Sequence, residues 1–363
     1  MTNTTSAPTR TPGARTPDAR TPDGRAADKA ARARPWVAAW LLATAAMVAA
    51  MVVIGGITRL TESGLSMVEW RPLMGWIPPL GDADWERVFA LYRQTPEFRV
   101  HNAWMTLADF KTIFFWEYLH RVWGRLIGVV FAVPFLAFLA TGRLERAMAP
   151  RLAALFVLGA LQGGIGWWMV TSGLADEPQV SPYRLATHLS MAFLILGVLL
   201  WVALDLLSPQ PPTRVAPALR RGATAVLALV SLTVLAGAFV AGTDAGYAYN
   251  TFPLMDGSLV PAGYWDQGFA GLFEWVPAVQ FNHRWIAVTT ALVALGFSHW
   301  AGRRAPEPAR LPLRLLAALV VLQVGLGIAT LLLVVPVWLG ALHQAGAVAL
   351  FSAAVWTRFN LRG

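Results

Sequence analysis

Long apolar runs separated by polar connections dominate the pattern of this chain. Eight of them are long enough to cross about 30 Å of hydrocarbon, and they are too uniformly apolar to be helices of a soluble core. They lie near residues 36–57, 117–140, 151–172, 183–205, 222–243, 282–302, 311–334 and 338–357. Pro134 interrupts the second run, which a helix bundle tolerates. The pattern predicts an all-α, polytopic membrane protein with eight transmembrane helices.

Two of the connections, near residues 58–116 and 244–281, are long, and both fall on the same side of the membrane. The first contains two helix-start signals, one at Asp82 and Asp84 and one at Thr106 with Asp109 three positions later. Long ordered loops on one face often cover a site. We therefore expect the helix of the second span to begin before the membrane.

Composition and charge agree with this topology. The 363 residues are 56% hydrophobic and only 13% charged, with 17 Trp. If residues 1–35 are cytoplasmic and the spans alternate, the cytoplasmic side holds 19 Lys/Arg and 6 Asp/Glu, and the outer side holds 10 and 14. By the positive-inside rule, both termini are cytoplasmic. The net charge of +9 then reflects orientation toward membrane lipid, so no nucleic-acid partner is expected.

The chain divides into two halves that resemble each other. We predict a disordered cytoplasmic tail at 1–35, a four-helix half at 36–207, a cytoplasmic linker at 208–221 and a second four-helix half at 222–363. GGITRLTESGL echoes AGTDAGY, RPLMG echoes FPLMDG, LHR echoes NHR, and TH matches LH. Four helices repeated in the same orientation predict two pseudo-symmetric bundles about an axis along the membrane normal.

Four of the six histidines follow a polar loop and lead into an apolar run: His120, His188, His283 and His343. Histidine is costly in hydrocarbon and is a functional candidate there. A six-coordinate haem needs one imidazole on each side of its ring. We therefore predict two bis-histidine haem irons, one held by the first two histidines and one by the last two. Alternatives are histidines that reach the interface, or zinc, for which further ligands are missing.

The remaining histidines and the missing cysteines narrow the chemistry. His299 lies near Arg303 and Arg304 at the inner face, where we expect it to reach the interface, and His101 receives no role. The absence of cysteine excludes disulfides, thiolate haem ligation and iron–sulfur clusters. No glycine motif for nucleotides stands in a strand–turn–helix context.

Residues beside the histidines distinguish the two predicted centres. Arg121 and Arg284 each follow a candidate ligand and could bind haem propionates, or could instead reach lipid headgroups. Glu117 lies three positions before His120, and Gln280 holds the matching position in the second half. A carboxylate can exchange protons or stabilise a cation, whereas an amide cannot. The first centre is therefore expected to be reactive and the second to transfer electrons, unless Glu117 only neutralises Arg121.

With EYLHR, ATHLS, FNHRW, LHQAG and GGITRLTESGLSMVEWRPLMG in this order, the chain resembles the heme A synthases of proteobacteria and mitochondria over residues 36–359. The resemblance implies an inner-membrane oxidoreductase that oxidises the C8 methyl group of heme O to a formyl group, giving heme A for cytochrome oxidase. It implies a substrate site with Glu117, His120 and His188, and a permanent haem b on His283 and His343. The outer-loop cysteine pair of some bacterial relatives is missing, so no thiol-dependent step is implied.

The resemblance also suggests partners and location. Heme O synthase, cytochrome oxidase assembly factors and an unidentified electron acceptor are the expected partners. The expected location is the bacterial inner membrane. The alternative is the mitochondrial inner membrane, although the three Asp residues of the tail argue against a transit peptide. Two other functions remain open: a di-haem b electron-transfer protein, which would not need Glu117 to differ from Gln280, and a transporter, whose polar residues should lie nearer the midplane.

Overall fold

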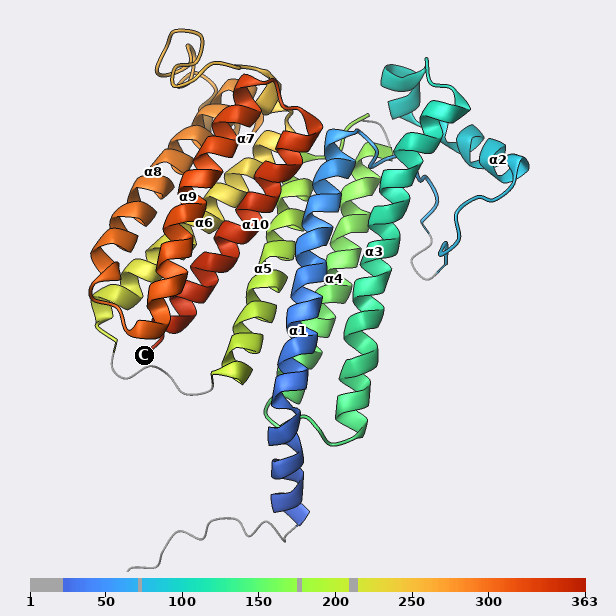
Figure 1. Ribbon diagram of the computed structural model, residues 1–363. Helices are drawn as coiled ribbons and strands as arrows, with labels where there is room; N and C mark the ends of the chain where they lie inside the picture. The colour runs from blue at the N-terminus through green and yellow to red at the C-terminus, as the bar shows by residue number, and fades with distance from the viewer. Residues whose placement is uncertain (1–21, 71–73, 175–177, 209–214) are drawn as a thin grey trace, which may run out of the picture.

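A computed structural model describes residues 22–70, 74–174, 178–208 and 215–363 of the chain. Within them, eight helices are long and apolar enough to cross a membrane, which confirms the predicted spans. They stand side by side in Figure 1 and are α1 (Pro22–Leu60), α3 (Leu107–Ala140), α4 (Ala149–Leu174), α5 (Pro182–Leu207), α6 (Pro217–Gly242), α8 (Val276–Gly302), α9 (Glu307–Leu332) and α10 (Val337–Asn360).

Four shorter elements lie in the two long connections. They are α2 (Asp82–Tyr92), a π-helical turn η1 (Phe98–Asn102), a 3-10 turn η2 (Ala245–Tyr247) and α7 (Gly268–Glu274). No strand occurs in the described residues, so the predicted all-α class is confirmed.

The predicted tail and linker differ from the structure. Helix α1 begins at Pro22 and includes Pro35, so the described part of the 1–35 tail is helical and the prediction of disorder there is wrong. The stretch AADKAARAR is rich in strong helix formers, and this local preference continues the membrane helix toward the N-terminus. Residues 1–21 lie outside the described part. In the predicted linker 208–221, α6 already begins at Pro217, while residues 209–214 are not described.

One apolar core joins the two halves. Helices α5 and α10 pack against each other, α1 packs against α10, and α5 packs against α6. Phe193 of α5 meets Phe351 of α10 edge to face, with ring centroids 5.2 Å apart. Toward the C-terminal ends of the same two helices, Trp201 and Phe359 repeat this contact at 5.3 Å. The two four-helix halves are therefore fused through their central helices rather than standing as separate bundles.

The outer end of the first half carries a small subdomain that covers the start of α3 (Figure 1). Helix α2 packs on α3 through a cluster of aromatic and aliphatic side chains: Phe89, Tyr92, Phe110, Ile113 and Phe114. The predicted capping signal is confirmed, because Thr106 and Asp109 form a capping box at the start of α3.

Three polar residues are buried under this subdomain. The Tyr92 hydroxyl donates to Glu97 at 3.0 Å and accepts from the Asn102 amide at 2.7 Å. Burial raises the pKa of Glu97 to about 8, because the buried carboxyl group loses its water. The nearby carboxylates of Glu117 and Glu62 also raise this pKa, while Tyr92 and Arg59 lower it.

Candidate functional site

The four candidate histidines lie early in four helices that run in the same direction. His120 is in α3, His188 in α5, His283 in α8 and His343 in α10. Successive spans alternate in direction, so these four helices begin at the end of the bundle that carries α2 and α7 (Figure 1). The structure therefore places all four at one end, as the sequence predicted.

The histidines approach each other in the predicted pairs. His120 lies close enough to His188 that a charge on one would repel a charge on the other, and the same is true of His283 and His343. In the part of the chain that the structure describes, no group of three His, Cys, Asp or Glu side chains could hold a metal ion. Two imidazoles without a third ligand suit a haem iron, whose other four ligands come from the porphyrin, better than zinc.

The surroundings of the imidazoles also fit a haem. The Nδ1 atom of His188 is buried and has no hydrogen-bond partner, which is costly unless a further group completes the site. Each of the four rings also lies against a glycine of a neighbouring helix, where no side chain fills the space. These are the features expected where an apolar disc enters between helices.

Glu117 is 3% exposed and binds the loop that follows α1. Its Oε2 accepts from the Ser66 hydroxyl at 2.7 Å and from the Met67 backbone N–H at 2.6 Å, and its Oε1 accepts from Arg121 Nη2 at 2.5 Å. A carboxylate accepts all three hydrogen bonds, whereas a neutral acid would present a donor to one of them. The ion pair with Arg121 that the sequence allowed is therefore present.

Arg121 also binds this loop. Its Nη1 donates to the Glu69 carbonyl at 2.9 Å, and its Nη2 donates to the Met67 carbonyl at 2.7 Å. Glu117 thus accepts from a backbone N–H of residues 67–69, and Arg121 donates to two of their carbonyls. We call this pair of side chains the clamp of the first half. This clamp lies one turn or less from His120 and fixes the loop beside it.

The second half has a corresponding clamp with different chemistry. Arg284 donates to the carbonyls of Thr251 and Tyr249, at 2.7 and 2.5 Å, and to Gln280 Oε1 at 3.0 Å. Gln280 is equally buried, but its Nε2 donates to the Ala245 carbonyl at 2.7 Å. The residue three positions before the histidine therefore faces backbone and hydroxyl donors in the first half and a carbonyl acceptor in the second.

Two glutamines that the sequence analysis did not select contact the other histidine of each half. Gln162 Nε2 in α4 donates to the His188 carbonyl at 3.0 Å, and Gln323 Nε2 in α9 donates to the His343 carbonyl at 2.9 Å. The repeated letters QGGIG and QVGLG, each in a long apolar run, were the signal that could have identified them.

Charged groups also connect the halves at the outer end. Helix α1 ends at Leu60 and α6 ends at Gly242. Two residues after these ends lie Glu62 and Asp244, and both have a positive φ, of 51° and 54°. Arg59 Nη2 pairs with Asp244 Oδ2 at 2.7 Å. This matched geometry is compatible with the predicted internal repeat.

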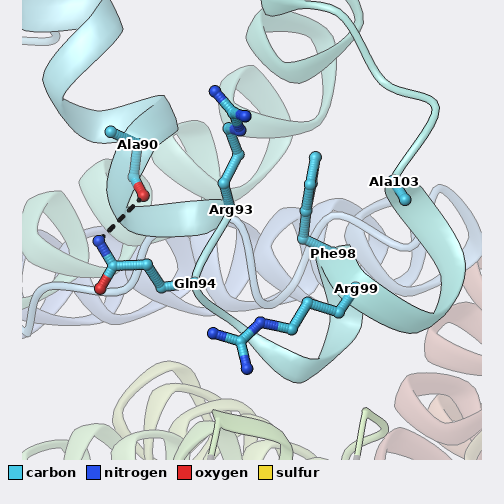
Figure 2. Close-up of a pocket in the computed structure, with 6 residues that line it drawn as sticks. All are labelled: Ala90, Arg93, Gln94, Phe98, Arg99 and Ala103. Carbon is cyan, nitrogen blue, oxygen red and sulfur yellow. Dashed lines mark hydrogen bonds between the residues drawn. The ribbon is translucent and has the colours of Figure 1, made fainter.

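The other candidates lie apart from the histidine pairs. His299 is exposed in the last turn of α8, and His101 is exposed in η1. Figure 2 shows a surface hollow in this subdomain, lined by residues that include Arg93, Phe98 and Arg99. At its edge the Gln94 amide donates to the Ala90 carbonyl at 3.3 Å. None of the four candidate histidines lines this hollow.

Comparison with known proteins agrees with this arrangement. Residues 38–355 match the family of cytochrome oxidase assembly proteins. The heme A synthase of Paramagnetospirillum magneticum is 53% identical over 332 residues, which cover 90% of this chain and 93% of the relative. That of Rhodospirillum centenum is 54% identical over 339 residues, covering 92% and 90%, and that of Nitrosospira multiformis is 49% identical over 334 residues, covering 90% and 93%. The chain belongs to the heme A synthase family of cytochrome oxidase assembly proteins.

Proposed function

We propose that this protein oxidises the C8 methyl group of heme O to a formyl group in its N-terminal half, with Glu117, His120 and His188 at the reacting centre. Conversion of a methyl to a formyl group with oxygen from water releases four electrons and four protons. The N-terminal half must therefore bind heme O, admit water and dispose of protons beside the methyl group. Its family membership makes the protein an oxidoreductase acting on heme O.

The assignment of the reacting centre to the N-terminal half rests on the difference between Glu117 and Gln280. Glu117 brings a buried negative charge to within one helical turn of His120, and the second half has a neutral amide in its place. A carboxylate there stabilises positive charge that develops on the oxidised methyl carbon, or accepts a proton. Because all its present partners are donors, we favour the fixed negative charge as its first role.

His283 and His343 would hold a permanent haem b. The proximity of the two histidines and the glycine beside each ring support this assignment. A haem with two imidazole ligands supplies one-electron transfer. Around it, the chain provides apolar helices and the Gln280–Arg284 clamp, which keeps the outer loop over the ligands and limits the entry of water.

Arg121 and Arg284 would close the outer loops over the two haems. Their Nη donors bind loop carbonyls, so propionate binding is left to the remaining donors. Arg284 Nε is such a donor, since it is buried and has no partner. A propionate at this position would satisfy it with a charge-assisted hydrogen bond.

We further propose that the protein lies in the bacterial inner membrane with both termini in the cytoplasm, because the charge distribution follows the positive-inside rule. Both haem sites would then lie near the outer surface. Heme O synthase would supply the substrate, and cytochrome oxidase assembly factors would receive the product. A separate electron acceptor would take the four electrons.

Chromatography of haems extracted from the purified protein tests this function. We expect haem b together with heme O or heme A. Haem b alone, in protein from cells that make heme O, would contradict the proposal and favour a di-haem b electron-transfer protein.

A further inference from the structure

We propose that four helical glycines, Gly55, Gly166, Gly237 and Gly327, are positioning residues that seat the four haem-ligating imidazoles. The inference rests on the proposed haem sites, and it assigns a function to residues that bind neither iron nor substrate. Each glycine stands on the helix next to the one that carries its histidine.

The distances are similar at all four places. A Cβ atom added to Gly166 would lie 2.9 Å from His188 Cε1, and one added to Gly327 would lie 3.0 Å from His343 Cε1. One on Gly237 would lie 3.1 Å from His283 Cε1, and one on Gly55 would lie 3.2 Å from His120 Nε2. Carbon atoms in comfortable contact are about 3.5–4.0 Å apart, so a Cβ atom at any of these positions would crowd the imidazole and displace it.

The glycines correspond between the halves. Gly55 lies five residues before the end of α1, and Gly237 lies five residues before the end of α6. Gly166 lies four residues after Gln162 of α4, which binds the carbonyl of His188. Gly327 lies four residues after Gln323 of α9, which binds the carbonyl of His343. A chance contact would not recur at matching positions on four helices.

A methyl group at these positions would act mainly on the imidazole. For His188 and His343, the glutamine holds the histidine backbone, so the ring must turn or shift by a few tenths of an ångström. The ring is the end of a rotatable side chain, and such a shift costs the fold little. It matters for the haem, because an iron–imidazole bond of about 2 Å tolerates little displacement.

The chain contains matched controls on the same helices. Gly164 in α4 and Gly325 in α9 each lie two residues before a proposed positioning glycine, and a Cβ added to either would meet no atom within 4 Å. Replacing any of these glycines by alanine raises helix propensity equally. Gly327→Ala against Gly325→Ala, and Gly166→Ala against Gly164→Ala, therefore separate the contact with the histidine from a general effect on the helix.

The test is performed on full-length protein purified in detergent, with haem b content and the low-spin optical and electron paramagnetic resonance spectra of the iron as readouts. We expect Gly327→Ala to weaken haem b binding by about 10–100-fold, the range for groups that orient a metal ligand, and to shift the low-spin signal. Gly325→Ala should match the wild type. Gly166→Ala, but not Gly164→Ala, should weaken heme O retention while the haem b spectrum stays unchanged.

Two outcomes would overturn the inference: Gly327→Ala with wild-type haem b content and spectrum, or equal effects of Gly327→Ala and Gly325→Ala. If Gly327→Ala does not accumulate, Gly237→Ala repeats the test on the other ligand of the same haem. The proposed function fails separately, if the wild-type protein itself shows no low-spin haem with two imidazole ligands.

Discussion

Helices α3 and α4 of the first half are covered far less than their counterparts α8 and α9 in the second. In the apolar window of α4 only 6% of the residues are buried inside the protein, against 17% in α9, and the shares for α3 and α8 are 11% and 28%. The other two helices show the opposite trend, since α1 and α5 of the first half are 44% and 39% buried, against 22% and 33% for α6 and α10. The first half therefore concentrates its packing on α1 and α5, whereas the second half spreads it over all four helices. We interpret the thinly covered side of α3 and α4 as the place where heme O would enter and heme A would leave.

Side-chain size accounts for part of this difference. When Gln162 is aligned with Gln323, Gly159 and Gly163 of α4 correspond to Val320 and Val324 of α9. Val320 is 1% exposed, whereas a Cβ on Gly159 or Gly163 would meet no atom within 4 Å. At Gly159 the first half thus lacks the apolar side chain that the second half buries at Val320, whereas Val324 is itself exposed.

The largest expected effect is the loss of a haem from one half only. His343→Ala should remove haem b, because a single imidazole does not hold a six-coordinate haem. The corresponding change, His188→Ala, should leave haem b in place and stop heme A formation. Haem b per purified protein and heme A in the cell measure the two effects. Retention of a low-spin haem b in His343→Ala would show that the halves are assigned wrongly.

The two clamps should differ in their contribution to stability. Glu117 and Arg121 are almost fully buried, with side chains 4% and 11% exposed, so Arg121→Met leaves a buried charge unpaired at a cost of about 3–5 kcal/mol. Arg284→Met leaves only neutral acceptors and should cost about 1–3 kcal/mol. Denaturant unfolding in detergent compares the variants. Equal losses would mean that the ion pair adds nothing beyond the hydrogen bonds to the loop.

The smallest effect concerns the outer subdomain of the first half. The pKa of Glu97 is raised to about 8 by burial, so the folded state binds its proton more tightly than the unfolded chain does. The stability that this proton provides is complete below the unfolded pKa of about 4.3 and is lost as the pH rises through about 8. Hydrogen exchange across residues 82–106 should therefore quicken between pH 6 and pH 9, after correction for intrinsic rates. In Glu97→Gln this additional pH dependence should disappear, and its persistence would exclude Glu97 as the cause.

The sequence was sufficient for the spans and the histidines, because membrane helices need long apolar runs and polar residues inside them are rare. The capping box at Thr106 and Asp109 was equally readable, since it depends on local geometry. The sequence did not predict the roles of Gln162, of Gln323 or of the four glycines, because each of these residues acts through a contact with another helix. The helical segment before Pro35 was missed because the low-complexity composition of the tail was taken to indicate disorder.

The Glu117/Gln280 contrast shows what a sequence comparison leaves open. From the sequence, the carboxylate indicates chemistry and the amide indicates its absence. In the structure, each side chain also matches its local backbone partner, an N–H of Met67 for Glu117 and the carbonyl of Ala245 for Gln280. Local hydrogen bonding alone could therefore account for the difference, and only an assay of the reaction separates the two explanations.

The most direct test of the reactive N-terminal half is the haem content of Glu117→Gln, produced in cells that depend on this protein for heme A. The account predicts heme A formation lowered by about 10²–10⁴-fold, with haem b at the wild-type level and heme O still bound. The haem b of the second half serves as the internal control for folding. Normal heme A formation by Glu117→Gln would show that the carboxylate only holds the loop, and would contradict the assignment of the reacting centre to this half.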